Sequence, residues 1–241
     1  MRLKRILKYL LFVVIIGFFS FLYSFTSVRN EQKKVTKIEV KFEEGNNNFL
    51  THAMVNKLLI QNDTIVTNQA KSVIDLYKLE NNVSKNPYVE NAAVFLTIGG
   101  VLKSTIKQRT PVARIISSKD SYYIDKQGVT IPLSSNYSAR VLLVSGVENK
   151  EDIQAVLPLI STILEDNFLQ KEIVGIVKSD VDAYEFSVRS GDYKIDFGKL
   201  KDVEIKFSKL KAFYNTTYKD KTIQEYKTIT VKYHNQVVCT K

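Results

Sequence analysis

A run of twenty residues without charge or proline, Tyr9 to Val28, constrains this chain more than any other feature. A helix rises about 1.5 Å per residue, so such a run spans roughly 30 Å, the thickness of a bilayer's hydrocarbon core. Only a helix satisfies the backbone hydrogen bonds of a single segment in lipid. The run therefore predicts a transmembrane anchor. Large apolar and aromatic side chains are expected to contact lipid: Tyr9, Phe12, Ile16, Phe19 and Leu22.

Cations flank this run unevenly. The topology signal is the group that precedes it: Arg2, Lys4, Arg5 and Lys8. Such a tail favours the cytoplasmic side, although Arg29, Lys33 and Lys34 reduce the asymmetry. We expect residues 1–8 in the cytoplasm, residues 9–28 across the inner (cytoplasmic) membrane, and the remaining chain outside it. Whether the outer compartment is a periplasm or a thick wall is left open.

A cleaved signal peptide is the main alternative for the N-terminus. Its apolar core is 7–15 residues long and precedes a site of small residues. The run here is longer, and bulky aromatic residues separate the small candidates Ser20, Ser24 and Ser27. A soluble buried helix fits less well still, because the run has no polar face. We expect an uncleaved anchor.

The charge distribution and the cysteine content limit which classes of partner and of covalent cross-link are expected. The net charge of +10 is spread over the chain, without the concentrated basic patch of a nucleic-acid-binding protein. Lys206, Lys209 and Lys211 alternate with apolar residues, which predicts a solvated helix face. Cys239 is the single cysteine and cannot form an internal disulfide. The chain is long enough for one or two domains after the anchor.

The region after the anchor predicts the order strand, helix, helix, strand, strand. The expected segments are a strand at Ile38–Phe42, a loop at Glu44–Asn48, a helix from Thr51 to about Leu59, a helix at Val73–Val83, and strands at Val89–Ile98 and Val101–Gln108. The residues Val73, Leu76, Tyr77 and either Leu79 or Glu80 recur near helical spacing. A tight turn is expected at Gly99-Gly100. One sheet face covered by two helices makes a small α+β domain.

This order resembles the POTRA domain. The string NPYVENAAV, from Asn86 to Val94, is similar to the sequence that leads into that domain's second strand. The string IKQRTPVA, from Ile106 to Ala113, resembles the end of the POTRA domain in the bacterial cell-division family FtsQ/DivIB. Gln108 or Arg109 stands where an acidic residue is common, which is a minor departure.

The second region predicts strands with two helices. The expected segments are a hairpin from Tyr122 to Leu133 with its turn at Asp125–Gly128, strands at Val141–Val144, Glu172–Val177, Tyr184–Val188 and Tyr193–Phe197, a helix from Asn149 to about Glu165, a helix at Lys201–Tyr218, and strands at Thr228–Tyr233 and Gln236–Cys239. Pro158 is expected to kink or restart the first helix. Val203, Phe207, Leu210 and Tyr214 form an apolar stripe on the second. His234-Asn235 is expected to be the last turn.

The resemblance to the FtsQ/DivIB family extends through this region. The hairpin from Tyr122 resembles the family's "YxIDxxGxxxPL" signature, and Thr228–Tyr233 resembles its terminal strand. The expected fold class is α+β: one N-terminal transmembrane helix, a β-α-α-β-β POTRA domain at 36–109, and a β-rich domain with flanking helices at 110–241.

The sequence carries little catalytic chemistry. His52 and His234 are its two histidines and make no zinc-binding spacing with one cysteine. It contains no nucleophile elbow, glycine-rich phosphate loop or HExxH motif. Asp125, near Asp120, is accounted for by its turn. We therefore predict no enzyme, no cofactor, no metal and no small-molecule substrate.

The family resemblance implies a non-enzymatic scaffold of the divisome that links early and late division proteins during septum assembly. It implies partners among small coiled-coil division proteins of the FtsB/DivIC and FtsL types, and other divisome proteins. A terminal strand at a sheet edge would accept a partner strand. The expected partner-binding residues are Val231, Lys232, Tyr233, Asn235, Gln236, Val237 and Val238. The alternative for Tyr233 is that it merely covers the sheet.

Two other functions remain open at this stage. The first is a POTRA-bearing transport or chaperone module for outer-membrane proteins, although such proteins usually carry several POTRA units or a barrel. The second is a membrane-anchored cell-wall enzyme, which needs a pair of carboxylates at a defined separation.

Overall fold

A computed structural model describes residues 2–31, 33–43, 45, 48–61, 64–179, 181–220 and 222–241. The side chains of residues 2–7, 31, 61, 64 and 65 are outside this description, and with them the topology signal except Lys8. The same holds for Glu44, Asn46 and Asn47 of the expected loop. Contacts divide the chain into two compact units, Met1–Gln108 and Arg109–Lys241.

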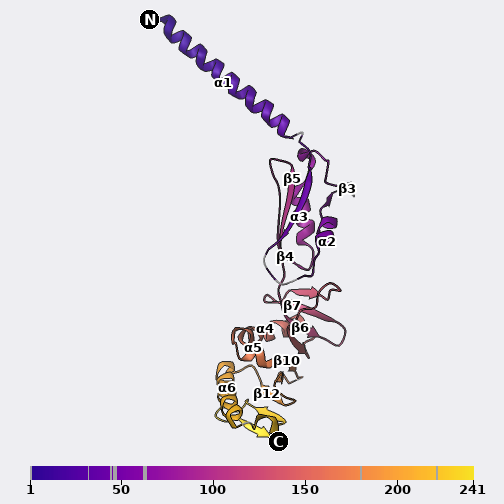
Figure 1. The fold of residues 1–241 in the computed structure, drawn as a ribbon. Helices are drawn as coiled ribbons and strands as arrows, with labels where there is room; N and C mark the ends of the chain where they lie inside the picture. Colours follow the sequence, from indigo (N-terminus) through magenta and orange to yellow (C-terminus); the bar gives the residue numbers. More distant parts are fainter. Residues whose placement is uncertain are drawn as a thin grey trace. The chain divides into compact units, whose positions relative to one another are not determined.

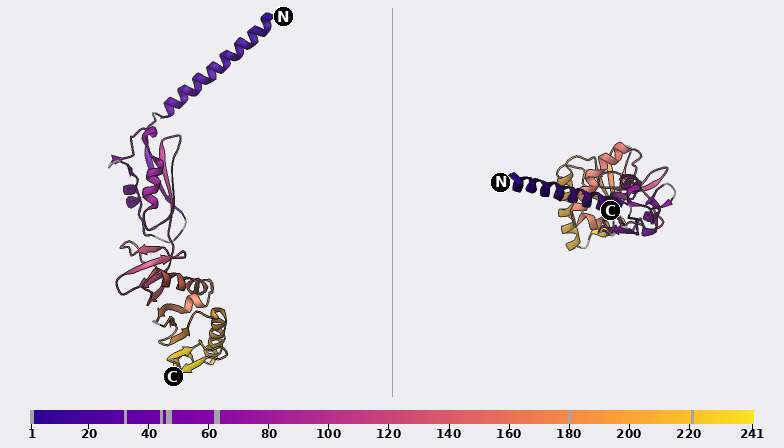
Figure 2. Two further views of the ribbon diagram at one scale, coloured as in Figure 1. Left: turned by 180° about the vertical axis from the view of Figure 1, so that it is seen from behind. Right: turned by 90° about the horizontal axis from the view of Figure 1, so that it is seen from above.

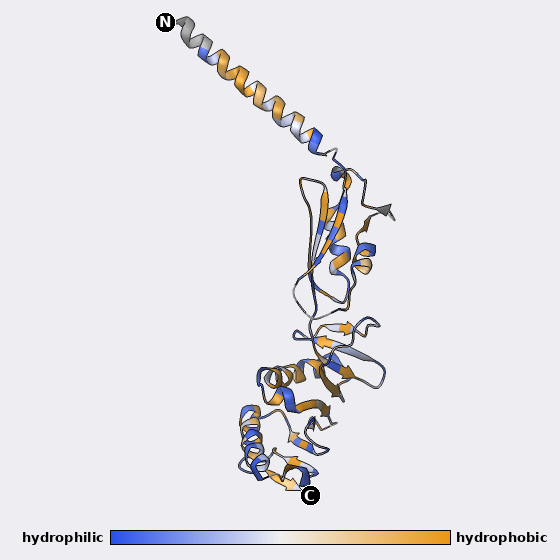
Figure 3. Ribbon diagram, viewed as in Figure 1, coloured by the Kyte–Doolittle hydropathy of each residue, from blue (hydrophilic) through white to orange (hydrophobic). Residues whose placement is uncertain are grey.

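Helix α1 (Arg2–Glu31) contains the predicted anchor. Its segment Lys8–Asn30 is long and apolar enough to cross a membrane, with a mean hydropathy of 2.1, and none of it is buried inside the protein. Figure 3 shows this helix as apolar along most of its length and hydrophilic at its C-terminal end. The expected lipid-facing residues, such as Phe12 and Phe19, are all exposed.

After α1, the first unit folds as a three-stranded sheet with two helices on one face (Figure 1, Figure 2). Its elements are β1 (Lys37–Phe42), α2 (His52–Leu58), β2 (Ile60–Gln61), β3 (Thr64–Ile65), the 3-10 helix η1 (Lys71–Val73), α3 (Leu76–Ser84), β4 (Val89–Leu96) and β5 (Val101–Gln108). The strand order is β1-β5-β4, with β1 parallel and β4 antiparallel to β5. Val55, Leu79 and Leu102 lie in one core, as the predicted β-α-α-β-β order requires.

Two details of this unit differ from the prediction. Helix α3 begins at Leu76 rather than Val73, because Asp75 caps it by accepting a hydrogen bond from the Lys78 amide. Val73 and Tyr77 consequently face solvent, with 57% and 77% of their surface exposed, and do not belong to the core. The short strands β2 and β3 were not predicted, since two residues show no periodicity.

The second unit contains one nine-stranded sheet. Its elements are β6 (Pro111–Ile116), β7 (Ser121–Asp125), β8 (Thr130–Pro132), β9 (Leu142–Ser145), α4 (Lys150–Glu165), α5 (Leu169–Glu172), β10 (Ile173–Lys178), β11 (Tyr184–Val188), β12 (Lys194–Gly198), α6 (Val203–Asp220), the 3-10 helix η2 (Ile223–Glu225), β13 (Thr228–Thr230) and β14 (Val238–Thr240). The strand order is β14-β13-β12-β11-β10-β9-β6-β7-β8. Strand β9 lies between β6 and β10 and is parallel to both, and β13 is parallel to β12.

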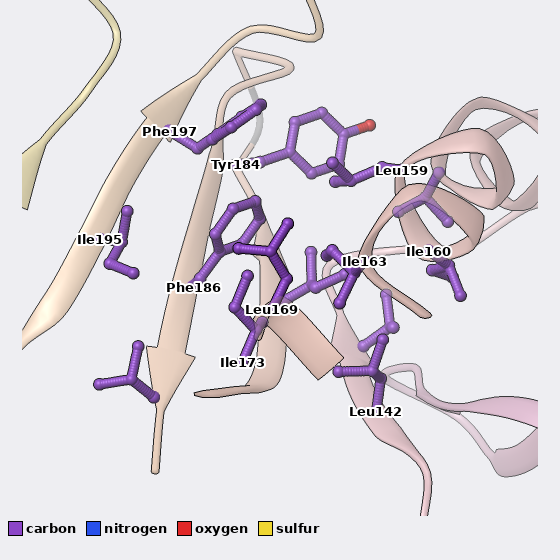
Figure 4. Close-up of a cluster of buried hydrophobic side chains, with 14 of the residues drawn as sticks. Leu142, Leu159, Ile160, Ile163, Leu169, Ile173, Tyr184, Phe186, Ile195 and Phe197 are labelled. Carbon is purple, nitrogen blue, oxygen red and sulfur yellow. The ribbon is translucent and has the colours of Figure 1, made fainter. Parts of the chain in front are cut away.

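The core of this unit lies between the sheet and its helices. Figure 4 shows Ile163 of α4 and Leu169 of α5 close to Phe186 and Ile173 of the sheet. Asn149 caps α4 through the Asp152 amide. Helix α4 runs through Pro158 without restarting, contrary to one predicted outcome. Its burial against the sheet compensates for the hydrogen bond that proline removes.

Three further predictions for this unit were wrong or incomplete. Strand β6 was not predicted, although its residues alternate between buried and partly exposed positions. Strand β13 ends at Thr230 instead of Tyr233. Lys206 is buried and donates a hydrogen bond to the Lys199 carbonyl at 2.6 Å, so the lysines of α6 do not form a solvated face.

The structure assigns the hairpin motif a structural role. One carboxylate oxygen of Asp125 accepts hydrogen bonds from the Gln127 and Val129 amides, each at 2.9 Å. The other pairs with Arg109 Nη1 at 2.7 Å. Gly128 has a φ of 79°, a conformation that favours glycine. Asp125 thus fixes the β7–β8 turn, as the sequence predicted.

Candidate partner-docking surface

The nine-stranded sheet ends at β14, which pairs with β13 alone among the strands that the structure describes. Their antiparallel register joins Thr228 to Thr240 and Thr230 to Val238. An edge strand presents backbone N–H and C=O groups on the side without a neighbour. Val238 is 39% exposed, whereas Cys239 packs against the core. The last strand therefore offers a short backbone edge with an exposed apolar side chain.

Helix α6 holds this end of the sheet in place. The ring of Phe207 lies 5.0 Å from that of Phe197 and 6.0 Å from that of Phe186. Ile229 and Val231 are fully buried. Helix α6 connects the parallel strands β12 and β13. Its packing therefore fixes the position of β13, the strand with which β14 pairs.

The connection from β13 to β14, residues 231–237, is held by side chains from elsewhere in the unit. The Val231 amide donates to the Asp196 carbonyl at 2.9 Å, one residue beyond the strand. Lys209 Nζ donates to the Val231 carbonyl at 2.9 Å and also to the Tyr233 carbonyl. Lys232 Nζ pairs with the Asp196 carboxylate at 2.7 Å. Tyr233 is left 47% exposed at the surface.

A pocket of about 470 Å³ lies between α6 and this connection. Its walls are polar and apolar: Lys209, Ala212, Phe213, Thr216, Thr217, Asp220, Thr222, Tyr226, Asn235, Gln236 and Val237. A pocket beside a backbone edge has room for a side chain of a bound segment, which is how strand addition gains specificity.

Two lysines beside the edge form ion pairs. The hydrogen bond from Lys232 to Asp196 raises the pKa of that lysine, and the one from Lys241 to Glu225 raises the pKa of Lys241. Burial raises the pKa of the Cys239 thiol, so this thiol stays protonated and is a weak nucleophile.

The seven residues predicted for partner binding lie at this one end of the sheet, but in different roles. Val238 is on the edge strand. Asn235, Gln236 and Val237 line the pocket. Lys232 and Tyr233 are exposed in the connection, where a strand was predicted. Val231 is fully buried and is not available to a partner.

Sequence reasoning missed the α6 wall of the pocket. Phe213 and Thr217 lie beside the predicted apolar stripe, and Lys209 binds the connection through its carbonyls. The apolar Phe213, three residues after Leu210, was the signal that the stripe is wider than four residues.

Other candidate chemistry is sparse in the described ranges. The described residues contain no group of three His, Cys, Asp or Glu side chains that could hold a metal ion. The ring of His52 lies 4.9 Å from that of Phe42, and His234 is exposed in the connection. Both histidines are surface residues, as predicted.

Each of the two units matches a model of a known protein family. A model described as "FtsQ/DivIB, C-terminal related" matches residues 110–240, more than half of the chain. The chain belongs to the FtsQ/DivIB family. A POTRA-like domain model matches residues 33–107, which confirms the POTRA resemblance of the first unit. With helix α1, membership of the FtsQ/DivIB family indicates a single-pass membrane protein.

One curated relative in this family is the cell division protein DivIB of Clostridium acetobutylicum. It is 27% identical over 91 residues, which are 35% of this chain and 36% of that protein. The matched segment therefore spans about a third of the relative's length.

Proposed function

We propose that this protein is a non-enzymatic, membrane-anchored scaffold of the bacterial divisome. Membership of the FtsQ/DivIB family and the similarity to a cell division protein support a role in division. The proposed scaffold links early and late division proteins during septum assembly. Its N-terminus lies in the cytoplasm and its two folded units lie outside the cytoplasmic membrane.

The observation that carries the docking proposal is the free edge of β14 beside the pocket at α6. A partner of the FtsB/DivIC or FtsL type adds an extended segment to β14 and places one side chain in the pocket. Main-chain hydrogen bonds supply affinity in such strand addition, and side-chain pockets supply specificity.

The anchor and the first unit have separate proposed tasks. The anchor confines the protein to the membrane and thereby raises its effective concentration for other membrane proteins. The first unit has its own sheet edges, β1 and β4, which are proposed to serve a second set of division proteins.

Localisation tests the division role directly. A fluorescent protein fused to the N-terminus is imaged in dividing cells while the native copy is depleted. The proposal expects a band at midcell and filamentous cells on depletion. Uniform membrane fluorescence with normal division would contradict the division role, and crosslinking to nascent barrel proteins would favour a transport module.

Co-purification tests the docking edge separately. Val238→Glu places a charge on the edge strand, and a loss of partner binding of about tenfold or more is expected. Val177→Glu is the matched control, because Val177 is 40% exposed on β10, in the interior of the sheet. Equal binding by both variants would contradict docking at β14. Proline at Val231 is unsuitable, since it would remove a buried, hydrogen-bonded amide.

A further inference from the structure

Three segments of the first unit meet just after α1: residues 33–36, residues 69–71 at η1, and the β4–β5 turn. Residues 33–36 lie between the other two segments. The Lys71 amide donates to the Lys33 carbonyl and the Val35 amide to the Gln69 carbonyl, both at 2.8 Å. On the other side, the Thr36 amide donates to the Gly100 carbonyl at 2.8 Å. The η1 helix and the β4–β5 hairpin turn are thus fixed to the first residues after the anchor.

The hairpin turn is fixed closely. Gly100 has a φ of 85°, and a Cβ added there would lie 2.4 Å from the Lys34 carbonyl oxygen. Only glycine permits this approach of the two backbones. The neighbouring Ile98 therefore has a defined position at the tip of the hairpin.

The chain itself keeps this end of the unit near the bilayer. The apolar span of α1 ends at Asn30, and Lys33 and Lys34 follow within four residues. Since extended chain covers at most about 3.6 Å per residue, both lysines remain within roughly 15 Å of the end of the span. This limit holds for any orientation of the folded unit.

The side chains at this end suit a membrane interface. Ile98 is 78% exposed and Val73 is 57% exposed. Lys33 and Lys34 are exposed, and Lys71 is half-buried. In the part of the chain that the structure describes, no carboxylate lies within ion-pair distance of these three lysines. Lys71 Nζ donates to the Asn30 side-chain oxygen at 3.2 Å, which leaves its charge uncompensated. Exposed apolar residues among cations without a carboxylate partner are typical of surfaces that bind anionic lipid.

We propose that this membrane-facing end, comprising Lys33, Lys34, Lys71, Val73 and Ile98, docks onto the anionic phospholipid headgroups of the bilayer that holds the anchor. The lysines contact phosphate groups, while Ile98 and Val73 enter the boundary between headgroups and acyl chains. A soluble polyanion would satisfy the lysines but would leave the two apolar side chains exposed, so a lipid surface fits better. Docking restricts the orientations of the first unit above the membrane.

The lysines and the apolar tip make separable contributions. A lysine near an anionic bilayer strengthens binding by about fivefold, and the effect declines as salt shortens the screening length. Burial of an isoleucine side chain in an apolar environment adds about tenfold or more. Docking is therefore expected to depend on lipid charge, on salt and on Ile98.

The test uses the full chain in nanodiscs. Cys239→Ser removes the single cysteine, and Gly99→Cys introduces a site for an environment-sensitive dye. A side chain at Gly99 meets no atom within 4 Å, so Ile98 stays in place. Asn91→Cys is the matched control, because Asn91 is exposed on β4, seven positions before Ile98 in the following turn. Quenching by spin-labelled headgroups is compared in discs of phosphatidylcholine with and without phosphatidylglycerol.

We expect stronger quenching at position 99 than at position 91 in discs that contain phosphatidylglycerol, and weaker quenching at 1 M salt. Replacing Lys33, Lys34 and Lys71 with glutamine is expected to lower the ratio of docked to free protein at least tenfold, and Ile98→Ser about tenfold. Equal quenching at the two positions would overturn the proposal. Quenching that does not change with lipid charge or with salt would also overturn it. So would a dye response to heparin in phosphatidylcholine discs as large as the response to phosphatidylglycerol.

Discussion

The two edges of the nine-stranded sheet differ in how they meet solvent. Strand β8 contains Pro132, which has no backbone N–H, so this three-residue edge lacks one donor. Strand β14 is also three residues long, but each of its residues keeps its N–H. Prolines on edge strands oppose pairing with other chains. This difference supports the proposal that a partner strand docks at β14 rather than at β8.

The support beneath each edge also differs. Asp125 and Arg109 hold the β7–β8 end through a buried ion pair and a tight turn. Helix α6 and Lys209 hold the β13–β14 end through aromatic packing and carbonyl contacts. The open edge thus depends on a helix that also forms the pocket wall. Changes in α6 should affect stability and partner binding together, whereas changes at Asp125 should affect stability alone.

The largest effect is expected from Phe207→Ala. Loss of its buried ring should reduce the stability of the second unit by about 3–5 kcal/mol and weaken partner binding as well. Hydrogen exchange of the β12 and β13 amides measures the stability. A change below about 1 kcal/mol would show that α6 does not support the open edge.

Asp125→Asn is expected to have the next largest effect. It removes the charge that pairs with Arg109, at a cost of about 2–3 kcal/mol for a pair that is mostly buried. If the partner docks at β14, its binding to the folded protein should not change, because β8 lies at the opposite edge of the sheet. Asp120→Asn, on an exposed residue, serves as the control and should be nearly neutral. A lower partner affinity of the folded Asp125→Asn protein would contradict the proposed difference between the two edges.

Lys209→Met is expected to act mainly on the open edge. The methionine keeps most of the side-chain stem but loses the donor to the Val231 and Tyr233 carbonyls. We expect a loss of about 1–2 kcal/mol in stability and a several-fold loss in partner affinity. Titration with the purified partner measures the affinity. Lys211→Met, two residues further along α6 and outside the pocket, should leave the affinity unchanged.

Acid should slightly lower the stability that the ion pair between Asp166 and Lys211 of α6 contributes to the second unit. A hydrogen bond from Lys211, together with the Leu169 amide, lowers the pKa of Asp166 below its ordinary 3.8. A lowered folded-state pKa means that this stabilisation is complete above that value and is lost as the pH falls below it. The pair is partly exposed, so the loss should stay under about 1 kcal/mol. Stability measured from pH 5 to pH 2 should fall less steeply in Lys211→Gln.

The smallest effect on the fold is expected from Pro132→Val, which restores the missing N–H on β8. Stability should change by no more than about 0.5 kcal/mol. Self-association of the detergent-solubilised chain should increase, as sedimentation would show. If it does not, Pro132 is not what protects this edge.

Local signals predicted much of this fold. Thr51 and Asn149 cap helices, Gly99-Gly100 and Asp125–Gly128 form turns, and Phe207, Leu210 and Tyr214 form the buried stripe of α6. Each of these caps, turns and stripes depends on residues that are close in sequence. They can be predicted because their physical cause lies within a few residues.

The features that were missed depend on distant residues. Strand β9 is placed between β6 and β10 by parallel pairing, which no periodicity reveals. Strand β13 ends early because Asp196 and Lys209 hold the following residues. Lys206 is buried because the Lys199 carbonyl receives its ammonium group. The position of β14 at the edge likewise follows from the whole sheet and not from its own sequence.

Hydrogen exchange with and without a DivIC-like partner tests the central claim most directly. The full chain is exchanged in nanodiscs, and the amides of Val238–Thr240 are compared with those of Thr130 and Ile131 on the opposite edge. Docking at the open edge predicts that partner binding slows exchange in β14 and leaves β8 unchanged. Slower exchange in β8 or in the first unit, with no change in β14, would contradict it.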